Sequence, residues 1–356
     1  AEVDWGGVFG GGRRVPLPHY PWQRQRCWFE APRTTTVGAL YDAVARGDAL
    51  ADGASEIDGG ERYLTFAPFA EPVAGFSWVL ATVDPTGHPE QARQVVAAQR
   101  AMREVLFRGV DFSRCADVLD FGCGYATDLL RLGEAHPHLK LHGYTVSAEQ
   151  ARIGGERARR AGLADRVAVF HRDSAAGEYV GDYDLMVGVE VVCHIRDKAA
   201  LFERIGAHLR PGGTLVLSDF VSGLSSDIEH EEAGSFLATA ERWVEVLSRS
   251  GLQLVACVDV SREIANFLDD PEFERHVAAV GAAGTAAALT SYDQLGKLLR
   301  RRMASYVLMT ARRVATAPAQ LVEENRRALA ERTPYAAVAD AGPREDDDGR
   351  YLEVVW

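Results

Sequence analysis

The chain has 356 residues, of which 47% are hydrophobic and 25% are charged, and its formal net charge at pH 7 is −12. This composition is typical of a globular protein with a sizeable core, arranged as one large domain or two smaller ones. The negative charge disfavours nonspecific binding to nucleic acid, which needs a basic face. Because the sequence shows no signal peptide and no apolar run of roughly 20 residues, we also expect no membrane partner.

The five cysteines show neither the spacing of disulfide pairs nor that of metal ligands. We therefore expect reduced thiols in a cytoplasmic protein. Histidines and carboxylates likewise lack ligand spacing, so we expect no metal site. Because the chain begins with Ala1 rather than methionine, we further expect a piece cut from something longer.

Three segments precede the first predicted strand of a sheet. Residues 1–30 contain the run LPHYPWQRQRCW at 17–28, whose prolines and alternating aromatics and arginines favour an extended strap across another surface. Residues 31–75 are predicted to be a connecting segment. Residues 89–108 are predicted to form a helix, because apolar residues recur there at helical spacing with arginines between them. That helix would either cover a ligand or pack on the edge of the sheet.

From residue 117 onward, predicted strands and helices alternate. Strands are predicted at 117–121, 139–145, 167–171, 184–189 and 214–219, with helices at 127–135, 148–161 and 198–209. This alternation predicts an α/β fold with a doubly wound, mostly parallel sheet, since parallel strands need helical crossovers. Ligands bind such sheets at the carboxyl ends of the strands. Further along we predict a helix at 239–250, a strand at 252–260, a helical insertion at 262–303, a last strand at 305–311 and a polar helix at 321–331.

The first predicted strand ends in Asp120 and is followed by a turn that contains Gly122 and Gly124. Glycines let the backbone approach a ligand where a Cβ would clash, and the next helix presents unpaired N–H groups. The third glycine and the lysine of phosphate-cradling loops are absent. This D-x-G-x-G pattern resembles motif I of the class I S-adenosylmethionine (SAM) methyltransferases. The resemblance implies a Rossmann-like fold with SAM as cofactor and S-adenosylhomocysteine as product.

Later segments extend this resemblance. Thr145 and Gln150 belong to a G-x-T-x-S-x-x-Q run, which resembles the cyclopropane-synthase branch of the family. There a hydroxyl and an amide can supply the hydrogen bonds of the acid that usually ends the second strand. The absence of that acid also disfavours a nicotinamide dehydrogenase, whereas Ser147 is expected to be a helix N-cap. The resemblance implies that Asp173 binds the adenine amino group with Ser174 nearby, and that Glu190 belongs to the cofactor site.

His194 follows the fourth predicted strand, where the methyl group of SAM would project. Imidazole is a suitable general base near neutral pH, and such a base is usually oriented by a carboxylate. We prefer Glu229, in the acidic stretch after the fifth strand, as that partner. Sequence cannot position a loop residue in space, so other assignments stay open. The alternative partners are Asp219, at the end of the fifth strand, Glu190 and Glu231, and the competing base is His230.

The run at 17–28 closely resembles the post-acyltransferase linker of modular polyketide synthases. This implies that neighbouring synthase domains are partners and that the substrate is held by phosphopantetheine on an acyl carrier protein. Residues 66–315 resemble the O-methyltransferase domain of these synthases, which implies methylation of the β-hydroxyl of the acyl chain. We therefore predict a linker at 1–30, a connecting segment at 31–75, a methyltransferase domain with an N-terminal helical cap at 76–315, and a C-terminal linker at 316–356.

Two other functions remain possible on the sequence. The first is C-methylation at the α-carbon of a β-ketoacyl carrier-protein substrate, and the second is an inactive domain that holds the synthase together. The intact glycine turn disfavours the second. A set of aromatic residues would either line an open substrate cleft or belong to the core, and core packing is the stronger interpretation. These residues are Phe76, Trp78, Trp243 and Tyr292.

Overall fold

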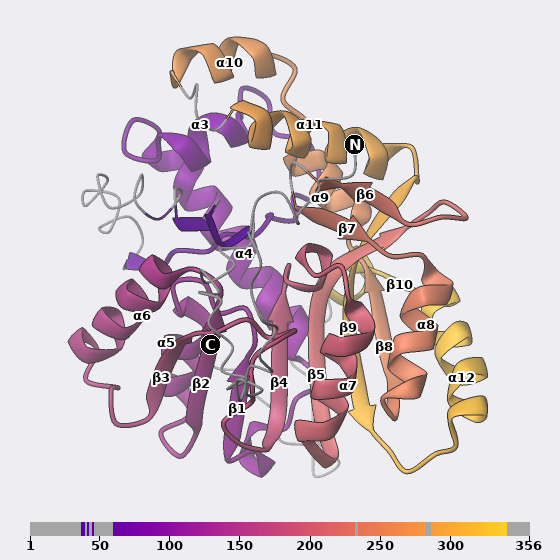
Figure 1. Ribbon diagram of the computed structural model, residues 1–356. Helices are drawn as coiled ribbons and strands as arrows, with labels where there is room; N and C mark the ends of the chain where they lie inside the picture. The colour runs from indigo at the N-terminus through magenta and orange to yellow at the C-terminus, as the bar shows by residue number, and fades with distance from the viewer. Residues whose placement is uncertain are drawn as a thin grey trace, which may run out of the picture. The chain divides into compact units, whose positions relative to one another are not determined.

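The computed structural model describes residues 37–39, 41–42, 45, 60–231, 234–281 and 286–339. Contacts divide the chain into Ala1–Arg33 and Thr34–Trp356, and the fold described here is that of the second unit (Figure 1). The linker predicted at 1–30 and much of the connecting segment lie outside the described residues, so the domain boundaries stay predictions. Within the described ranges, no helix combines the length and the apolar character needed to cross a bilayer.

Helices and strands alternate along the chain as the sequence predicts. Their bounds are α3 (Trp78–Val83), α4 (Pro89–Phe107), β1 (Asp117–Asp120), α5 (Thr127–Ala135), β2 (Lys140–Thr145), α6 (Ala148–Arg160), β3 (Val167–His171), β4 (Tyr183–Val189), α7 (Lys198–His208), β5 (Leu209–Ser222), β6 (Ile228–His230), β7 (Ser235–Leu237), α8 (Ala240–Arg249), β8 (Leu252–Asp259), α9 (Ser261–Phe267), α10 (Phe273–Ala279), α11 (Ala286–Arg300), β9 (Ala304–Arg313), α12 (Pro318–Ala330), β10 (Thr333–Pro334) and α13 (Tyr335–Ala339). Short 3-10 helices, η2 (Phe112–Arg114) and η3 (Val192–His194), precede β1 and α7.

The central sheet has the strand order β10-β8-β9-β5-β4-β1-β2-β3. Strands β1 to β5 pair in parallel, whereas β9 runs antiparallel to both β5 and β8. Leu119 of β1 lies opposite His142 of β2 on one side and Met186 of β4 on the other. This arrangement confirms the predicted doubly wound, mostly parallel sheet. The direction of winding reverses between β1 and β4, which is where such sheets bind ligands.

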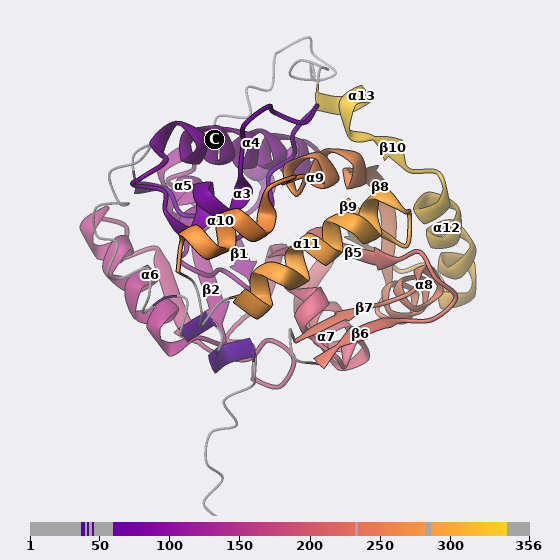
Figure 2. The ribbon, with the colours of Figure 1, turned by 90° about the horizontal axis from the view of Figure 1, so that it is seen from above.

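Each face of the sheet is covered by its own hydrophobic cluster. Successive residues of a strand point to opposite faces, so Val118 belongs to the cluster that includes residues of α4, α5 and α6. Its neighbour Leu119 belongs to the cluster that includes residues of α7, α8 and α12. Figure 2 looks down on the sheet, with α4 and α5 on one side and α7 and α8 on the other. The helices therefore form the two outer layers that a doubly wound fold requires.

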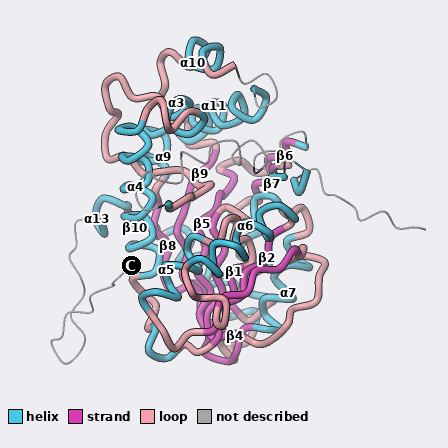
Figure 3. Tube along the Cα trace, turned by 90° about the vertical axis from the view of Figure 1, so that its left-hand side faces the viewer, coloured by secondary structure: helices cyan, strands magenta, loops and turns pink. Residues whose placement is uncertain are grey.

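The helical insertion α9–α11 and the N-terminal helix α3 form a cap above the sheet (Figures 1 and 3). A buried polar cluster joins them: the Ser77 hydroxyl donates to Asp270 Oδ2 at 2.5 Å, and His276 Nδ1 lies 2.9 Å from Asp270 Oδ1. The Trp78 ring stacks on Phe273 with centroids 5.8 Å apart. Of the aromatic residues proposed for a substrate cleft, only Tyr292 is substantially exposed, at 36%. The core interpretation therefore describes the others, which are Phe76, Trp78 and Trp243.

The chain beyond residue 315 packs against the same sheet. Helix α12 lies against α8 and β8, and β10 pairs in parallel with β8. The fully buried amide of Asn325 donates to Ser248 Oγ at 3.0 Å and to Leu252 O at 2.9 Å, and it accepts from the Leu254 amide at 2.6 Å. Residues 318–339, which were predicted to be part of a linker, thus extend the domain's sheet and one of its helical layers.

Strand β5 continues to Ser222, past its predicted end at Asp219. Phe220 and Val221 extend it because they pair with Tyr306 and Ser305 of β9. Asp219 therefore lies inside the strand, with its side chain fully buried. After β5, the acidic stretch forms a hairpin that the sequence did not predict, in which β6 and β7 pair antiparallel.

Candidate active site

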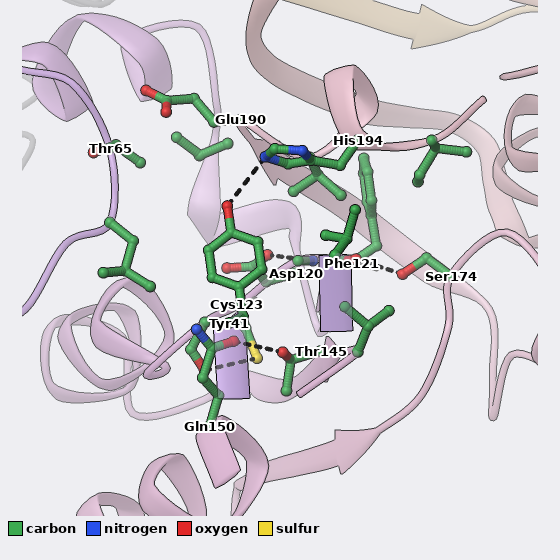
Figure 4. A pocket seen from close by; sticks show the side chains of 18 of the residues that line it. Tyr41, Thr65, Asp120, Phe121, Cys123, Thr145, Gln150, Ser174, Glu190 and His194 are labelled. Carbon is green, nitrogen blue, oxygen red and sulfur yellow. Dashed lines mark hydrogen bonds between the residues drawn. The ribbon is translucent and has the colours of Figure 1, made fainter. Parts of the chain in front are cut away.

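A cavity of about 380 Å³ opens at the carboxyl ends of β1, β2 and β4 (Figure 4). It is lined by every residue predicted for the cofactor site and by the predicted base. These residues are Asp120, Gly122, Gly124, Thr145, Gln150, Asp173, Ser174, Glu190 and His194. They come from the ends of different strands, which parallel pairing brings to one edge of the sheet. The other predicted catalytic residues, Asp219 and Glu229, do not line the cavity.

The turn after β1 needs both of its glycines. The Gly122 amide donates to Asp120 Oδ1 at 3.0 Å, and a Cβ added at Gly122 would lie 2.0 Å from Cγ2 of Val191. Gly124 has φ +49°, a left-handed conformation that side chains disfavour. The turn therefore brings bare backbone to the wall of the cavity, immediately before α5.

Asp120 is a buried carboxyl group at the base of the cavity. Burial raises its pKa to about 7, and the nearby Asp128 carboxylate adds to the rise, while the Gly122 amide and Arg103 oppose it. A group that titrates near neutrality can accept a hydrogen bond from a ligand and becomes fully charged when that ligand is cationic. Its position suits the amino group of an amino acid.

Thr145 and Gln150 face each other across the start of α6. The Thr145 hydroxyl donates to Gln150 Oε1 at 2.7 Å. The Gln150 Nε2 atom is buried and has no hydrogen-bond partner among the described residues. An unpaired buried donor is costly, so this amide is available to donate to a ligand in the cavity, such as a ribose hydroxyl. The Ser147 hydroxyl oxygen accepts from the backbone N–H of Gln150 at 3.1 Å, which confirms its predicted role as N-cap of α6.

Asp173 and Ser174 lie just beyond β3. Asp173 Oδ1 accepts from the Ala175 amide at 2.8 Å, which holds the carboxylate at the rim of the cavity. The buried Ser174 hydroxyl donates to the carbonyl of Phe121 and so ties this loop to the turn after β1. Together they form the side of the cavity where the sequence predicts the adenine ring.

Glu190 directly follows β4 and has φ 55°, which is a strained conformation for a residue with a side chain. Its Oε1 atom accepts from the Phe66 amide and from the Tyr306 hydroxyl, both at 2.8 Å. Burial raises its pKa to about 7. In Figure 4 the Glu190 carboxyl group points away from the ring of His194, so the structure does not pair these two residues.

His194 lies at the end of η3, and its contacts define which ring nitrogen carries the proton. Its Nδ1 atom is 2.9 Å from the carbonyl oxygen of Gly234, which can only accept, so Nδ1 carries the proton. The Nε2 atom then has the lone pair, and it lies 3.1 Å from the hydroxyl of Tyr41. Burial lowers the pKa of the imidazole below its usual value, and Lys198 adds to this effect. His194 is thus a neutral imidazole whose accepting nitrogen faces the cavity.

Asp219 holds the turn that carries His194. Its Oδ2 atom accepts from the amides of Val192 at 2.7 Å and Cys193 at 3.2 Å. Burial raises the pKa of Asp219 to about 6, while the Phe220 amide and Lys198 oppose the rise. This carboxylate therefore positions the backbone next to the imidazole rather than the imidazole itself.

The structure does not bring Glu229 to His194. The Glu229 carboxylate instead forms an exposed ion pair with Arg196 at 2.9 Å, and Glu231 pairs with the same guanidinium at 2.6 Å. The hairpin explains this outcome, because its turn brings the Gly234 carbonyl to the imidazole while Glu229 points outward. His230 is exposed on the same hairpin, with Nδ1 3.4 Å from Ser291 Oγ.

Several residues of the cavity were not predicted from the sequence. Tyr41 lies in a stretch whose sequence has no periodic pattern, so no signal identified it. Arg103 was read as one of the polar arginines of the helix at 89–108, but it is buried and pairs with Asp128 at 2.6 Å. The four-residue spacing of Gln99 and Arg103 is visible in the sequence, and the structure places both residues on the buried face of α4.

The buried ion pair predicts a stability effect. Replacing Arg103 by methionine leaves the Asp128 carboxylate buried without its partner, so we expect the free energy of unfolding to fall by about 3–5 kcal/mol in urea denaturation. Arg93→Met, which breaks an exposed pair with Glu90, is the matched control and should change stability far less. Adding Asp128→Leu to Arg103→Met should recover much of the loss. Equal losses of stability in Arg103→Met and Arg93→Met would contradict this account.

Comparisons with known proteins match the chain to methyltransferases. A family model described as a methyltransferase domain matches residues 119–215. The polyketide synthase ThaQ of Burkholderia thailandensis is 38% identical over 272 residues, which are 76% of this chain and 13% of ThaQ. The chain thus spans only a small part of that relative.

Solved structures resemble the chain over most of their length. The O-methyltransferase from a trans-AT polyketide synthase multienzyme of Brevibacillus brevis, in complex with S-adenosyl-L-homocysteine, is 33% identical with a TM-score of 0.76, covering 78% of this chain and 94% of that one. The StiE O-methyltransferase is 39% identical with a TM-score of 0.72, covering 80% of this chain and 98% of that one. The chain therefore belongs to the family of SAM-dependent O-methyltransferase domains of polyketide synthases and has their class I methyltransferase fold.

Proposed function

We propose that this domain methylates the β-hydroxyl of an acyl chain held on an acyl carrier protein, with His194 as the general base. The observation that carries the proposal is the proton arrangement of His194. Its Nδ1–H donates to Gly234 O, so the Nε2 lone pair is directed into the cavity that the glycine turn lines. The proposed site of the methyl donor and the proposed base therefore lie in the same cavity.

The residues of the cavity suit SAM. The backbone at Gly122 and Gly124, with Asp120 below it, would hold the amino-acid portion. Thr145 and the unpaired Nε2 of Gln150 would hold the ribose hydroxyls. On the opposite side, Asp173 would accept from the adenine amino group beside Ser174, while Glu190 closes the cavity at the end of β4. When bound, SAM supplies an electrophilic methyl group on a sulfonium, whose carbon–sulfur electron pair leaves with sulfur.

The chain's own contribution to the chemistry is proton transfer and positioning. A neutral hydroxyl is a weak nucleophile, and it gains strength when a base takes its proton as the new carbon–oxygen bond forms. Nε2 of His194 would accept that proton, and the Gly234 carbonyl would hold the resulting imidazolium through Nδ1–H. Asp219 would keep the base in place by binding the amides of Val192 and Cys193. Glu229, paired with Arg196 on the surface, receives no proton-transfer role in this proposal.

The nature of the acceptor is supported by similarity. ThaQ is a polyketide synthase, and the Brevibacillus brevis domain is part of a polyketide synthase multienzyme. The post-acyltransferase linker predicted at 1–30 would place this domain in a synthase module as well. Substrates of such modules are thioesters on carrier proteins, and the oxygen available for methylation on a freshly reduced chain is the β-hydroxyl.

A methyl-transfer assay on paired substrates tests the proposal. A 3-hydroxyacyl carrier protein and its 3-ketoacyl counterpart are incubated with the domain and SAM, and intact masses are measured. We expect the hydroxyacyl substrate to gain one methyl group and the ketoacyl substrate to stay unchanged. A 3-methoxyacyl carrier protein is the matched control and should gain nothing. Methylation of the ketoacyl substrate alone would replace the proposal with C-methylation, and methylation of neither would favour a structural domain.

A further inference from the structure

Tyr41 makes a contact with the base that the proposed function leaves unexplained. Its hydroxyl lies 3.1 Å from His194 Nε2, and the two rings meet edge to face with centroids 5.7 Å apart. In Figure 4 the Tyr41 side chain extends across the cavity, from the side of Gln150 to the ring of His194. The nitrogen that should accept the substrate's proton is therefore already hydrogen-bonded to a protein side chain.

The direction of this hydrogen bond follows from the other side of the ring. Because Nδ1 donates to Gly234 O, Nε2 can only accept, and the Tyr41 hydroxyl must be the donor. Burial raises the pKa of Tyr41 well above its usual value near 10, so the phenol keeps its proton at neutral pH. A ring nitrogen has one lone pair, and it lies in the plane of the ring. Tyr41 and an acceptor hydroxyl therefore cannot both donate to it in good geometry.

Resting on the proposed function, we propose that the Tyr41 hydroxyl marks the position of the acceptor oxygen and that the substrate hydroxyl displaces it from His194 Nε2. Tyr41 is then a positioning residue. It keeps the empty base in the tautomer needed for catalysis and shields it from water. It also competes with the substrate for the same hydrogen bond. Displacement exchanges one neutral O–H···N bond at Nε2 for another, and the loss of this partner by the Tyr41 hydroxyl weakens substrate binding.

Neighbouring contacts keep Tyr41 close to the cavity. Asp42 Oδ1 accepts from the Glu149 amide at 3.3 Å and from the Ser147 hydroxyl, which secures the next residue at the start of α6. On the other side, Val37 packs against Gly234, where an added Cβ would lie 2.5 Å from Val37 Cγ2. Tyr41 thus lies between two contacts that do not involve its own hydroxyl, so breaking its hydrogen bond to His194 leaves these contacts intact.

Tyr41→Phe in the full chain tests this inference with two measurements. An O–H donor to Nε2 stabilises the neutral imidazole, so its removal should raise the pKa of His194, measured by NMR titration without substrate. Without the competing hydroxyl, the KM for the hydroxyacyl carrier protein should fall about fivefold, while kcat changes by less than about threefold. A fall in kcat of more than about a hundredfold at unchanged KM would overturn the inference, since it would assign Tyr41 to proton transfer. Unchanged KM and unchanged imidazole pKa would overturn it as well.

Tyr183→Phe is the matched control, because Tyr183 makes a similar contact outside the cavity. Its hydroxyl lies 3.0 Å from His142 Nδ1. Removing this hydroxyl should leave both the KM and the pKa of His194 as in the wild type, and equal changes in both variants would overturn the inference. The NMR titration needs no turnover, so its result is independent of whether His194 proves to be the base. Failure of the proposed function would instead be seen as full activity of His194→Ala.

Discussion

His194→Ala is expected to lower kcat for methyl transfer by about 10²–10⁴-fold, the usual contribution of a general base. The affinity for S-adenosylhomocysteine should stay within severalfold of the wild type. The reason is geometric: His194 faces the cavity with its Nε2 atom, whereas the residues proposed to hold the donor lie on the turn after β1 and on α6. Single-turnover kinetics and calorimetry measure the two effects separately.

The pH dependence of wild-type activity should report the titration of the same residue, His194. Burial lowers the pKa of His194 below its usual value near 6.5, so the imidazole is neutral and able to accept a proton at pH 7. Activity should then rise with pH through that lowered pKa and reach its plateau on the acidic side of neutrality. His230→Ala is the matched control, since His230 is exposed on the neighbouring hairpin. If His230→Ala lost activity while His194→Ala kept it, the base would be reassigned.

Gly122→Arg is expected to abolish SAM binding, with a loss of at least about a hundredfold in affinity by calorimetry. The first added atom already meets Val191, because a Cβ at Gly122 would lie 2.0 Å from Val191 Cγ2. The rest of the arginine side chain would have to enter the cavity, where the donor would lie. Loss of even a few hydrogen bonds from that cavity corresponds to such a factor, at about 1 kcal/mol for each.

Gly155→Arg is the control for the charge and size of the arginine side chain introduced in Gly122→Arg. Gly155 lies in α6, and a Cβ there would meet only the end of the Arg159 side chain, at 3.9 Å. Arginine is also the better helix former, so the variant should fold and bind SAM as the wild type does. Gly122→Ala adds the Cβ alone and should give an intermediate loss. Wild-type affinity in Gly122→Arg would mean that the donor binds elsewhere.

Local patterns in the sequence were enough to predict the doubly wound fold. The predicted helix at 127–135 and the predicted strand at 167–171 match α5 and β3, because each has a strong periodic pattern and a clear turn at its ends. The full extent of strand β5 and the packing of the C-terminal elements were harder to predict. The extension of β5 depends on pairing with β9, and the packing of α12 depends on Asn325, whose polar side chain gives no sign in sequence that it is buried.

The order of strands and helices was enough to predict the cavity residues that lie at the strand ends, because the carboxyl ends of parallel strands converge wherever helical crossovers join them. Asp120, Thr145, Asp173 and Glu190 each end or follow such a strand. The contacts that hold His194, in contrast, follow from the three-dimensional path of the chain. His194 and its partner Gly234 are 40 residues apart, and the partner atom is a main-chain carbonyl, which every residue has. Tyr41 reaches the same ring from a segment with no pattern of its own. Contacts of this kind depend on the path of the chain in space rather than on residue type, and so they cannot be read from residue order.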